Sequence, residues 1–229
     1  MKTLLIAVRL TLVTLVLTGI VYPLAVTGVA QVLFPDKANG SLITDPSGKV
    51  VGSELLAQGF AAAVYFQPRP SAAGNGYDPQ ASGGTNLGPT SKKLRDRVAG
   101  DVERLRKENP DAKGDVPLEL VTTSASGLDP ELSPEAATWQ VPRIAAARGV
   151  AAERVAQIVT EETQGRTLGL FGEPRVNVLR MNLALDRRFG APPPSALPSP
   201  TPTATTSASS ASAPVNTPVN TPVNTPSGT

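Results

Sequence analysis

Ser91, Lys92 and Lys93 are residues of this chain whose types and spacing could support covalent chemistry. A serine hydroxyl becomes a nucleophile when a neighbouring lysine takes its proton, and this arrangement needs no histidine. That matters because the chain has no histidine and no cysteine, which excludes histidine-based triads, thiol nucleophiles and zinc sites built on these residues. The same residues also suit the solvated first turn of a helix. A stand-alone, membrane-anchored Ser/Lys hydrolase is therefore one interpretation, and a structural role is the other.

A second chemical candidate is the run GGTNLGPT at residues 83–90, which nearly matches a phosphate-binding loop. Pro89 stands where that loop has its lysine, and proline supplies neither a cation nor a backbone N–H. A turn leading into a helix is the favoured interpretation. Arg69 could bind a carboxylate or phosphate through its planar guanidinium, or pair with an acidic residue of its own domain.

These candidates lie within residues 65–94, a polar stretch rich in glycine, proline and asparagine. Loops longer than about 12–15 residues are usually functional or disordered. Aromatic residues and varied polar residues argue against disorder, whose composition is poor in aromatics. We therefore expect an ordered surface segment that contacts another molecule.

A second polar stretch covers residues 122–148. Residues 126–130 have the composition of a turn, in which Asp129 suits local backbone bonding. Gln140 and Arg143 share one face of a predicted helix and are expected to be available for polar recognition. Trp139, the only tryptophan, is expected in the core.

The elements that position these groups follow from apolar periodicity and from end signals. Helices are predicted over residues 91–108, 133–148 and 151–163, strands over 49–51 and 118–122, and a helical turn over 53–58. Residues 176–188 are apolar and fit either period. The mixture predicts one small α/β (α+β) domain rich in helices.

An uncharged run of 25 residues, 10–34, follows Lys2 and Arg9. About 20 apolar residues span a bilayer, whereas a signal peptide has an apolar region of only about 7–15. The run is therefore predicted to be an uncleaved single-pass transmembrane helix. Both flanking basic residues precede it, while Asp36 and Lys37 nearly cancel after it. The positive-inside rule then places residues 1–9 in the cytoplasm and the main domain outside it.

Small and hydroxyl residues recur at steps of three and four within this run, so they share one face of a helix: Thr11, Thr14, Thr18, Ala25 and Gly28. Such a face favours docking against other membrane helices, although an ordinary anchor with scattered threonines is the alternative. Pro23 is expected to kink the helix or to leave a carbonyl in need of another partner.

Four regions result: residues 1–9, the span at 10–34, a soluble domain at 35–189 and a tail at 190–229. The tail has no charge, ten prolines and three copies of Pro-Val-Asn-Thr, which predicts a disordered, partly polyproline segment. The soluble domain holds 19 basic and 19 acidic residues and shows no basic stripe. Binding to nucleic acid is therefore not expected.

Five blocks of the sequence together resemble the KdpC family, the C subunit of the Kdp potassium-transporting ATPase. They are TGIVYPLAVTGVAQVLFP in the span, FQPRPSA at 66–72, SGGTNLGPTSKKL at 82–94, SGLDPELSPEAATWQVPRIAAARG from Ser126, and VNVLRMNLALD from Val176. The resemblance covers roughly residues 4–186. Pro68, Asp78 and Ser91 depart from the family pattern, which has Gly, Asn and Asn, and the tail lies outside it.

The resemblance implies an accessory, non-catalytic, single-pass subunit in the plasma (inner) membrane, within a complex that imports K⁺ at the expense of ATP. The implied partners are a channel-like A subunit and a P-type B subunit that hydrolyses ATP. The family is described as a catalytic chaperone that raises the ATP affinity of the B subunit. The nucleotide-binding segment so implied contains Ser126, Gly127, Asp129 and Gln140.

A domain outside the cytoplasm would not meet cytoplasmic ATP, so we also expect a second role in which the domain caps the outer mouth of the A subunit. The polar loop and the membrane helix are then the partner interface, and the chain itself holds no metal. The predicted interface residues are Arg69, Pro70, Ser71, Asn86, Leu87, Gly88, Pro89 and Thr90 in the loop, and Thr11, Thr14, Thr18 and Gly28 in the span.

Overall fold

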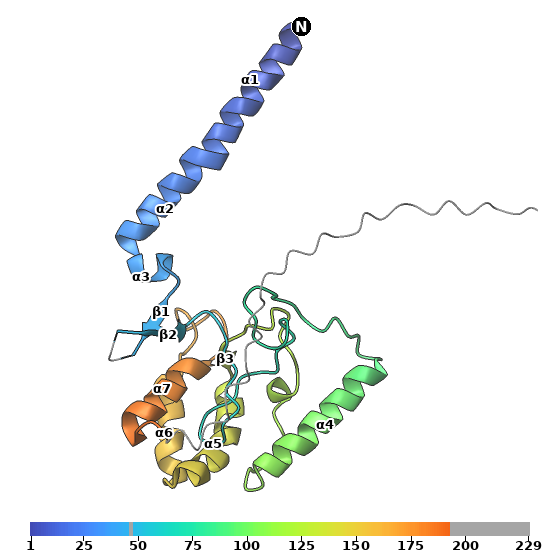
Figure 1. Ribbon diagram of the computed structural model, residues 1–229, viewed down its shortest axis with the longest axis vertical. Helices are drawn as coiled ribbons and strands as arrows, with labels where there is room; N and C mark the ends of the chain where they lie inside the picture. The colour runs from blue at the N-terminus through green and yellow to red at the C-terminus, as the bar shows by residue number, and fades with distance from the viewer. Residues whose placement is uncertain (46–47, 193–229) are drawn as a thin grey trace, which may run out of the picture. The chain divides into compact units, whose positions relative to one another are not determined.

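The computed structural model describes residues 1–45 and 48–192 (Figure 1). Its helical segments are α1 (Lys2–Val16), η1 (Leu17–Val21), α2 (Tyr22–Leu33), α3 (Pro35–Ala38), α4 (Lys92–Glu108), η2 (Leu118–Leu120), α5 (Pro134–Arg148), α6 (Ala152–Glu162) and α7 (Val178–Phe189). Its strands are β1 (Leu42–Thr44), β2 (Val50–Ser53), β3 (Glu131–Leu132) and β4 (Val176–Asn177). The predicted class, one N-terminal apolar helix and a small α+β domain, is confirmed. The tail prediction for residues 193–229 lies outside the described residues.

The N-terminal helix is continuous from Lys2 to Leu33 and is long and apolar enough to cross a membrane, with a mean hydropathy of 2.4. It begins before residue 10, so it includes the charged flank. Pro23 lies in the first turn of α2, directly after the π turn η1. In that turn the Tyr22 N–H bonds to the Leu17 carbonyl, five residues back. The wider turn thus accommodates a proline that would otherwise clash with the preceding turn of the helix.

The hydroxyls of this helix bond within it. Thr14 Oγ1 donates to Leu10 O at 2.9 Å, and Thr18 Oγ1 donates to Thr14 O at 2.7 Å. A π turn contains one residue more than an α turn, so Ala25 and Gly28 are displaced by about 100° from the threonines. The single small-residue face expected from the sequence is therefore divided into two shorter ones, and their contact with partner helices stays a prediction.

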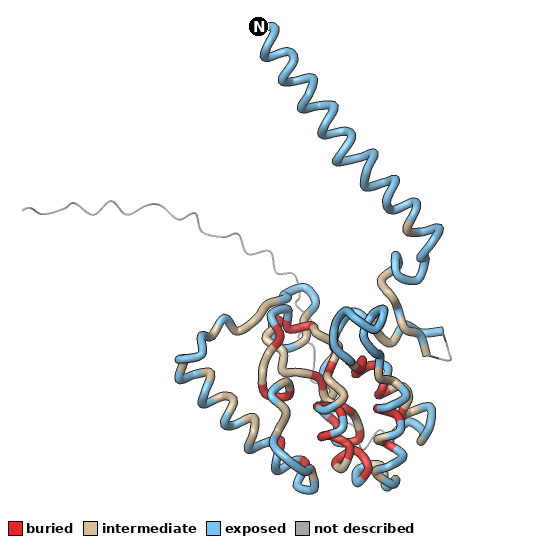
Figure 2. The backbone as a smooth tube through the Cα atoms, turned by 180° about the vertical axis from the view of Figure 1, so that it is seen from behind, coloured by how far each residue is buried: buried red, intermediate tan, exposed pale blue. Residues whose placement is uncertain are grey.

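The core of the domain is built on α5, α6 and α7, where Figure 2 shows the buried backbone concentrated. Ile144, Val155, Ile158, Met181 and Leu185 are almost completely buried. Two antiparallel ribbons complete the domain, β1 with β2 and β3 with β4. Helix α5 is covered on most of its surface, which explains why its apolar pattern is not confined to one face.

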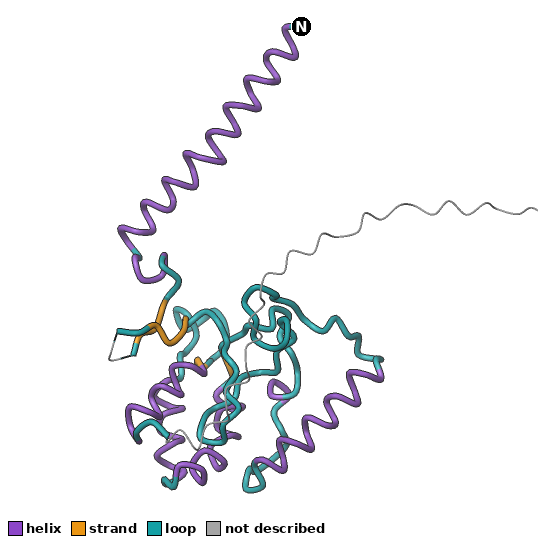
Figure 3. The backbone as a smooth tube through the Cα atoms, in the orientation of Figure 1, coloured by secondary structure: helices purple, strands orange, loops and turns teal. Residues whose placement is uncertain are grey.

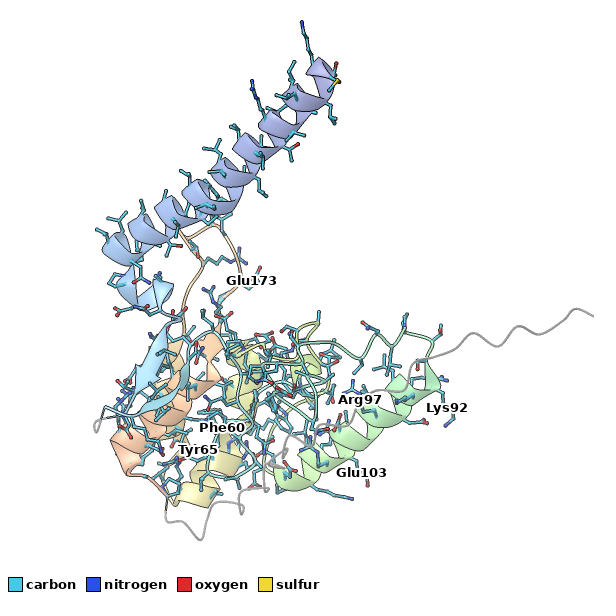
Figure 4. All side chains as sticks on the ribbon, turned by 45° about the horizontal axis from the view of Figure 1, so that its top comes forward. Phe60, Tyr65, Lys92, Arg97, Glu103 and Glu173 are labelled. Atoms are coloured by element: carbon cyan, nitrogen blue, oxygen red, sulfur yellow. The ribbon has the colours of Figure 1, made fainter. Side chains whose placement is uncertain are left out.

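Local signals place the ends of two predicted helices correctly. Ser133 Oγ accepts from Ala136 N at 3.2 Å where α5 begins, and Gly149 ends it in the left-handed region at φ 64°. Ser91 caps α4 in the same way, accepting from Leu94 N. Helix α4 lies at one edge of the domain with Lys92 and Glu103 in solvent, and only Leu105 of this helix is buried (Figure 4).

Two sequence predictions are wrong. Residues 118–122 form a short 3₁₀ helix instead of a strand, and Leu120 and Val121 pack into the core as part of that turn. The helical turn expected at 53–58 is a non-helical turn that follows β2. The segment 176–188, whose apolar pattern fits either a strand or a helix, forms both in succession, first β4 and then α7. Asn177 separates them, because its side chain accepts from Arg180 N at 3.1 Å and starts the helix.

Candidate functional site

The two polar stretches of the sequence lie directly against each other in the structure. Ser82 Oγ and Gly83 N both donate to Ser126 O, at 3.0 and 2.9 Å. Ser71 Oγ donates to Gly127 O at 2.6 Å. We call residues 69–90 together with residues 122–129 the loop surface; its coil segments are teal in Figure 3. The contacts make an ordered unit of a segment that has almost no regular secondary structure.

Gly127 is the residue that permits this close approach. Its φ is +66°, and a Cβ atom there would lie 2.7 Å from Ala73 N and 2.8 Å from Gly83 O. Both neighbours are backbone atoms, which cannot rotate away. The Gly127 N–H donates to Ser124 Oγ at 2.8 Å, so the turn is also closed internally. Only glycine combines this backbone angle with this contact.

Arg69 and Asp129 pair across the loop surface, at 2.9 Å between Nη1 and Oδ2, and both are partly exposed. The other Asp129 carboxylate oxygen accepts from Glu131 N at 3.0 Å. Of the two roles left open for Arg69, the structure therefore shows pairing with an acidic residue of its own domain. The ion pair joins the first residue of the loop surface to the last.

Tyr77 fixes the same loop from inside. Its hydroxyl donates to Arg69 O at 2.8 Å, and its N–H donates to Ser71 Oγ at 2.8 Å. Burial raises the pKa of its phenol to about 12, because the ionised form would lose its hydration. The residue also has a positive φ of 56°, which only a well-supported loop maintains.

The distal part of the loop surface faces solvent. Asn86, Gly88, Pro89 and Thr90 are exposed, and Leu87 is half-buried. Asn86 has a φ of +50°, a conformation that asparagine tolerates better than most residues. This loop does not run from a strand into a helix as a phosphate loop does, so the turn interpretation is confirmed.

Two groups of the hydrolase interpretation, Ser91 and Lys92, make other contacts. Ser91 Oγ caps α4, and Lys92 Nζ forms an ion pair with Asp96 one helical turn on. A lysine base must be neutral and within hydrogen-bonding distance of the serine. The Lys92 ammonium contacts Asp96 and the Ser91 hydroxyl contacts Leu94 N, so the geometry favours the structural interpretation.

Gln140 and Arg143 lie inside the domain, with only 2% and 8% of their surface exposed, so the prediction that they are available for polar recognition is wrong. Gln140 Oε1 accepts from Gln67 N at 2.8 Å and from Arg143 Nη2 at 2.8 Å. Its Nε2 donates to Gln67 O at 3.0 Å and to Ala136 O at 3.4 Å. All four hydrogen-bonding positions of this amide are used within the domain.

The Arg143 guanidinium bonds the backbone that leads into the loop surface. It donates to Ala63 O at 2.8 Å and to Tyr65 O at 3.0 Å. Burial lowers its pKa to about 10, because the charge has few compensating partners in the interior. Gln140 and Arg143 therefore hold residues 63–67 in place and position the loop surface from behind.

Comparison with known proteins bears on the identity of this domain. The sequence profile described as "K+-transporting ATPase, c chain" matches residues 4–187, which includes the membrane helix and the whole loop surface. The chain belongs to the KdpC family.

Relatives agree with this assignment. A protein of Myxococcus xanthus named "Potassium-transporting ATPase KdpC subunit" is 66% identical over 197 residues, which is 86% of this chain and 93% of the relative. Proteins of the same name from Rhodospirillum rubrum and Koribacter versatilis are 56% and 52% identical, over 76% and 84% of this chain and 89% and 98% of their own lengths. The resemblance noted in the sequence is thus confirmed.

The nucleotide-binding residues implied by the KdpC resemblance do not form one cluster. Ser126, Gly127 and Asp129 belong to the loop surface, whereas Gln140 lies behind it in the interior. A cavity of about 400 Å³ between the loop and α4 has Gln140, Tyr77 and Arg104 in its wall. A ligand of nucleoside size falls within the range that such volumes hold.

Sequence reasoning missed the residues that hold the entry to the loop surface. Asn182 clamps Phe66 from both sides, accepting from its N–H at 2.8 Å and donating to its carbonyl at 3.0 Å. Asp186 accepts from Tyr65 Oη at 2.8 Å and pairs with Arg148 at 2.7 Å. The signal in the sequence was Asn182, which stands among the apolar residues of 176–188, where a buried polar residue needs a partner.

Proposed function

We propose that this chain is an accessory, non-catalytic subunit of an ATP-driven K⁺ importer and that it stabilises the association of a channel-like A subunit with a P-type ATPase B subunit. Membership of the KdpC family and the one candidate membrane span found among the described residues support this role. The observation that carries it is the construction of the loop surface. Its two segments are fastened to each other by the contacts of Ser71, Arg69 and Ser126, while Asn86 and its neighbours remain exposed for contact with a partner.

We further propose that the domain lies outside the cytoplasm and covers the outer mouth of the A subunit. The supporting observation is the excess of basic charge before the membrane helix, Lys2 and Arg9, compared with the cancelling pair Asp36 and Lys37 after it. The rigid loop surface would then face the partner from that side.

Orientation can be measured with single cysteines, because the chain has none of its own. A cysteine replacing the exposed Asn75 is expected to react with a membrane-impermeant maleimide in intact cells. A cysteine replacing Thr3 is the matched control, and it should react only after permeabilisation. The reverse pattern would place the domain in the cytoplasm and contradict the capping role.

The partner interface can be tested at Asn86. We expect Asn86→Gly to lower recovery of the A and B subunits on the tagged chain by about threefold to tenfold, as the loss of one or two hydrogen bonds would. Glycine keeps the positive φ, so the loop retains its backbone conformation. The control is Gln157→Ala, which removes an exposed amide on α6 that donates to Glu161 one helical turn on. Equal recovery for both variants and the unchanged chain would exclude this part of the loop surface as an interface.

The proposed accessory role also includes an effect on ATP binding by the B subunit. We propose that the chain raises the ATP affinity of the B subunit, with Ser126, Gly127 and Asp129 acting through the loop surface and Gln140 acting indirectly by positioning residues 63–67. The saturated hydrogen bonds of Gln140 support an indirect action. The effect on ATP affinity can be measured in the complexes prepared with Asn86→Gly. A weaker association should raise their apparent KM for ATP, and an unchanged KM in complexes that have lost this chain would contradict the proposal.

A further inference from the structure

Residues 164–175 form a hairpin that belongs to neither site discussed above. Gln164 and Arg175 bond each other's backbone in both directions at 2.8 and 3.0 Å, and Thr167 and Phe171 do the same at 2.8 and 3.0 Å. Leu168 and Leu170 lie between the members of the second pair, and Phe171 is one of those members. The exposed fractions of Leu168, Leu170 and Phe171 are 89%, 70% and 62%. Figure 4 labels Glu173 on this hairpin, which extends away from the packed helices. The hairpin therefore places three large apolar side chains in solvent at one narrow tip.

The backbone at the tip adds to this anomaly. Leu168 has a φ of +55°, in the left-handed region that costs about 1–2 kcal/mol for a residue with a side chain. Glycine or asparagine would occupy this position with less strain. A leucine at this position has both a strained backbone and a side chain exposed to water, and neither stabilises the domain. Its presence therefore indicates that the side chain contacts an apolar environment outside the domain.

Polarity changes in order along the hairpin. Directly behind the apolar tip, Arg166 and Glu173 pair across the two arms of the hairpin at 2.7 Å. At the base, Arg175 pairs with Glu131 at 2.7 Å. Segments that enter the boundary between lipid headgroups and acyl chains have this arrangement, in which an apolar tip is followed by charged residues. A protein-binding hairpin would instead be expected to present directional polar groups among the apolar ones.

The base of the hairpin is tied to the chain segment that leaves the membrane helix. Arg175 leads directly into β4, where Asn177 Nδ2 donates to Glu54 O at 2.8 Å. Glu54 N in turn donates to Ser41 O at 3.0 Å. The helical span ends at Leu33, so the tether from Phe34 to Ser41 is eight residues long.

The tether and the hairpin have comparable lengths. Eight residues extend at most about 28 Å, at about 3.5 Å per residue. From Arg175 to the tip at Leu170 is five residues, which reach about 15 Å in extended conformation. Because α3 shortens the tether further, the tip lies within reach of the membrane surface from which the tether emerges.

We propose that the tip of the 164–175 hairpin inserts Leu168, Leu170 and Phe171 into the interfacial region of the bilayer that the N-terminal helix spans. This second contact with the membrane would restrict the rotation of the domain on its short tether. The inference rests on the N-terminal helix being a membrane anchor, and it is independent of the proposed A and B contacts.

The experiment uses the full-length chain in lipid nanodiscs of phosphatidylcholine and phosphatidylglycerol. A single cysteine replacing Leu170 carries an environment-sensitive fluorophore, and a second preparation carries the same label in place of Leu118, a leucine of matched exposure (71%) on η2. We expect a blue-shifted emission at residue 170 and about twofold or stronger quenching by spin-labelled lipids than at residue 118, as shallow insertion predicts.

A double variant, Leu168→Asn with Phe171→Ser, should abolish this difference while Trp139 fluorescence remains that of the folded domain. Water-like emission at residue 170 in nanodiscs would overturn the proposal. So would a blue shift that arises only when the partner subunits are added and that lipid quenchers do not affect, because the tip would then dock on protein. Quenching that persists in the double variant would equally contradict it.

Discussion

Replacing Gly127 by alanine is expected to destabilise the domain by about 3–5 kcal/mol, at the high end for a single methyl group. The new Cβ would lie 2.7 Å from Ala73 N, 2.8 Å from Gly83 O and 2.9 Å from Ala73 Cβ. Because two of these atoms belong to the backbone, relief requires the loop and the turn to separate. Separation would break the bonds from Ser71 and Gly83 to the turn and leave their polar groups unpaired.

Gly149→Ala is the matched control for this substitution. Gly149 has nearly the same φ, +64°, but a Cβ there would have no atom within 4 Å. Its cost is therefore only that of the left-handed conformation, about 1–2 kcal/mol. The two free energies of unfolding can be compared by urea denaturation of the full-length protein in detergent, followed by Trp139 fluorescence. Equal losses for the two variants would show that backbone strain, and not loop packing, determines the effect.

The Gly127 variant also separates folding from function. If the loop surface is the partner interface, Gly127→Ala should lose the A and B subunits at temperatures where Trp139 still reports a folded core. The core helices α5, α6 and α7 do not depend on the turn for their apolar contacts. A variant that assembles normally despite a disrupted loop surface would remove this region from the interface.

The helices could be predicted from sequence because their signals are local. Ser91 and Ser133 cap helices three residues before the groups that they bond, and Gly149 ends α5 at the residue where the pattern stops. The class of the fold and its membrane helix follow from the same short-range patterns. The strand predicted at 118–122 failed because a short buried apolar run has no period that distinguishes a strand from a turn.

The sequence predicted that the loop surface is ordered, but it did not predict which residues contact each other there. Its contacts join residues that are 38–60 positions apart, such as Thr85 with Thr123 and Arg69 with Asp129. Contacts of this kind follow no repeat along the chain. The same reason hides the role of Gln140, since its partners at Gln67 lie 73 residues away. Polar residues on a helix suggest a solvent face unless the tertiary partner is known.

The interior network behind the loop surface leads to the second large expected effect. Arg143→Ala should lower the free energy of unfolding by about 3–5 kcal/mol, as removal of one member of a buried charged network does. The guanidinium serves three acceptors, Ala63 O, Tyr65 O and Gln140 Oε1, at 2.8, 3.0 and 2.8 Å. An alanine would leave the two carbonyls without this donor and Gln140 Oε1 with only the Gln67 N–H, and the buried Gln140 would lose one of its partners.

The loss of hydration of the Arg143 guanidinium opposes this stabilisation. The same loss of hydration lowers the pKa of Arg143 to about 10. Replacing a buried ion by an apolar residue is often neutral when its partners can be replaced too. Here two of the acceptors are backbone carbonyls, which no substitution removes. Arg143→Met should therefore keep the volume and still lose most of the stability, and Arg143→Lys should recover only part of it because an ammonium lacks the planar fork.

Arg106→Ala provides the comparison at the surface, since this arginine is about half-exposed and pairs with the fully exposed Asp115. Its loss should change the free energy of unfolding by less than about 1 kcal/mol. All four arginine variants can be measured by the same urea denaturation. If Arg143→Met proved as stable as the unchanged protein, the carbonyls at 63 and 65 would have found other donors. Residues 63–67 would then hold the loop surface without this network, and the indirect role assigned to Gln140 would fall with it.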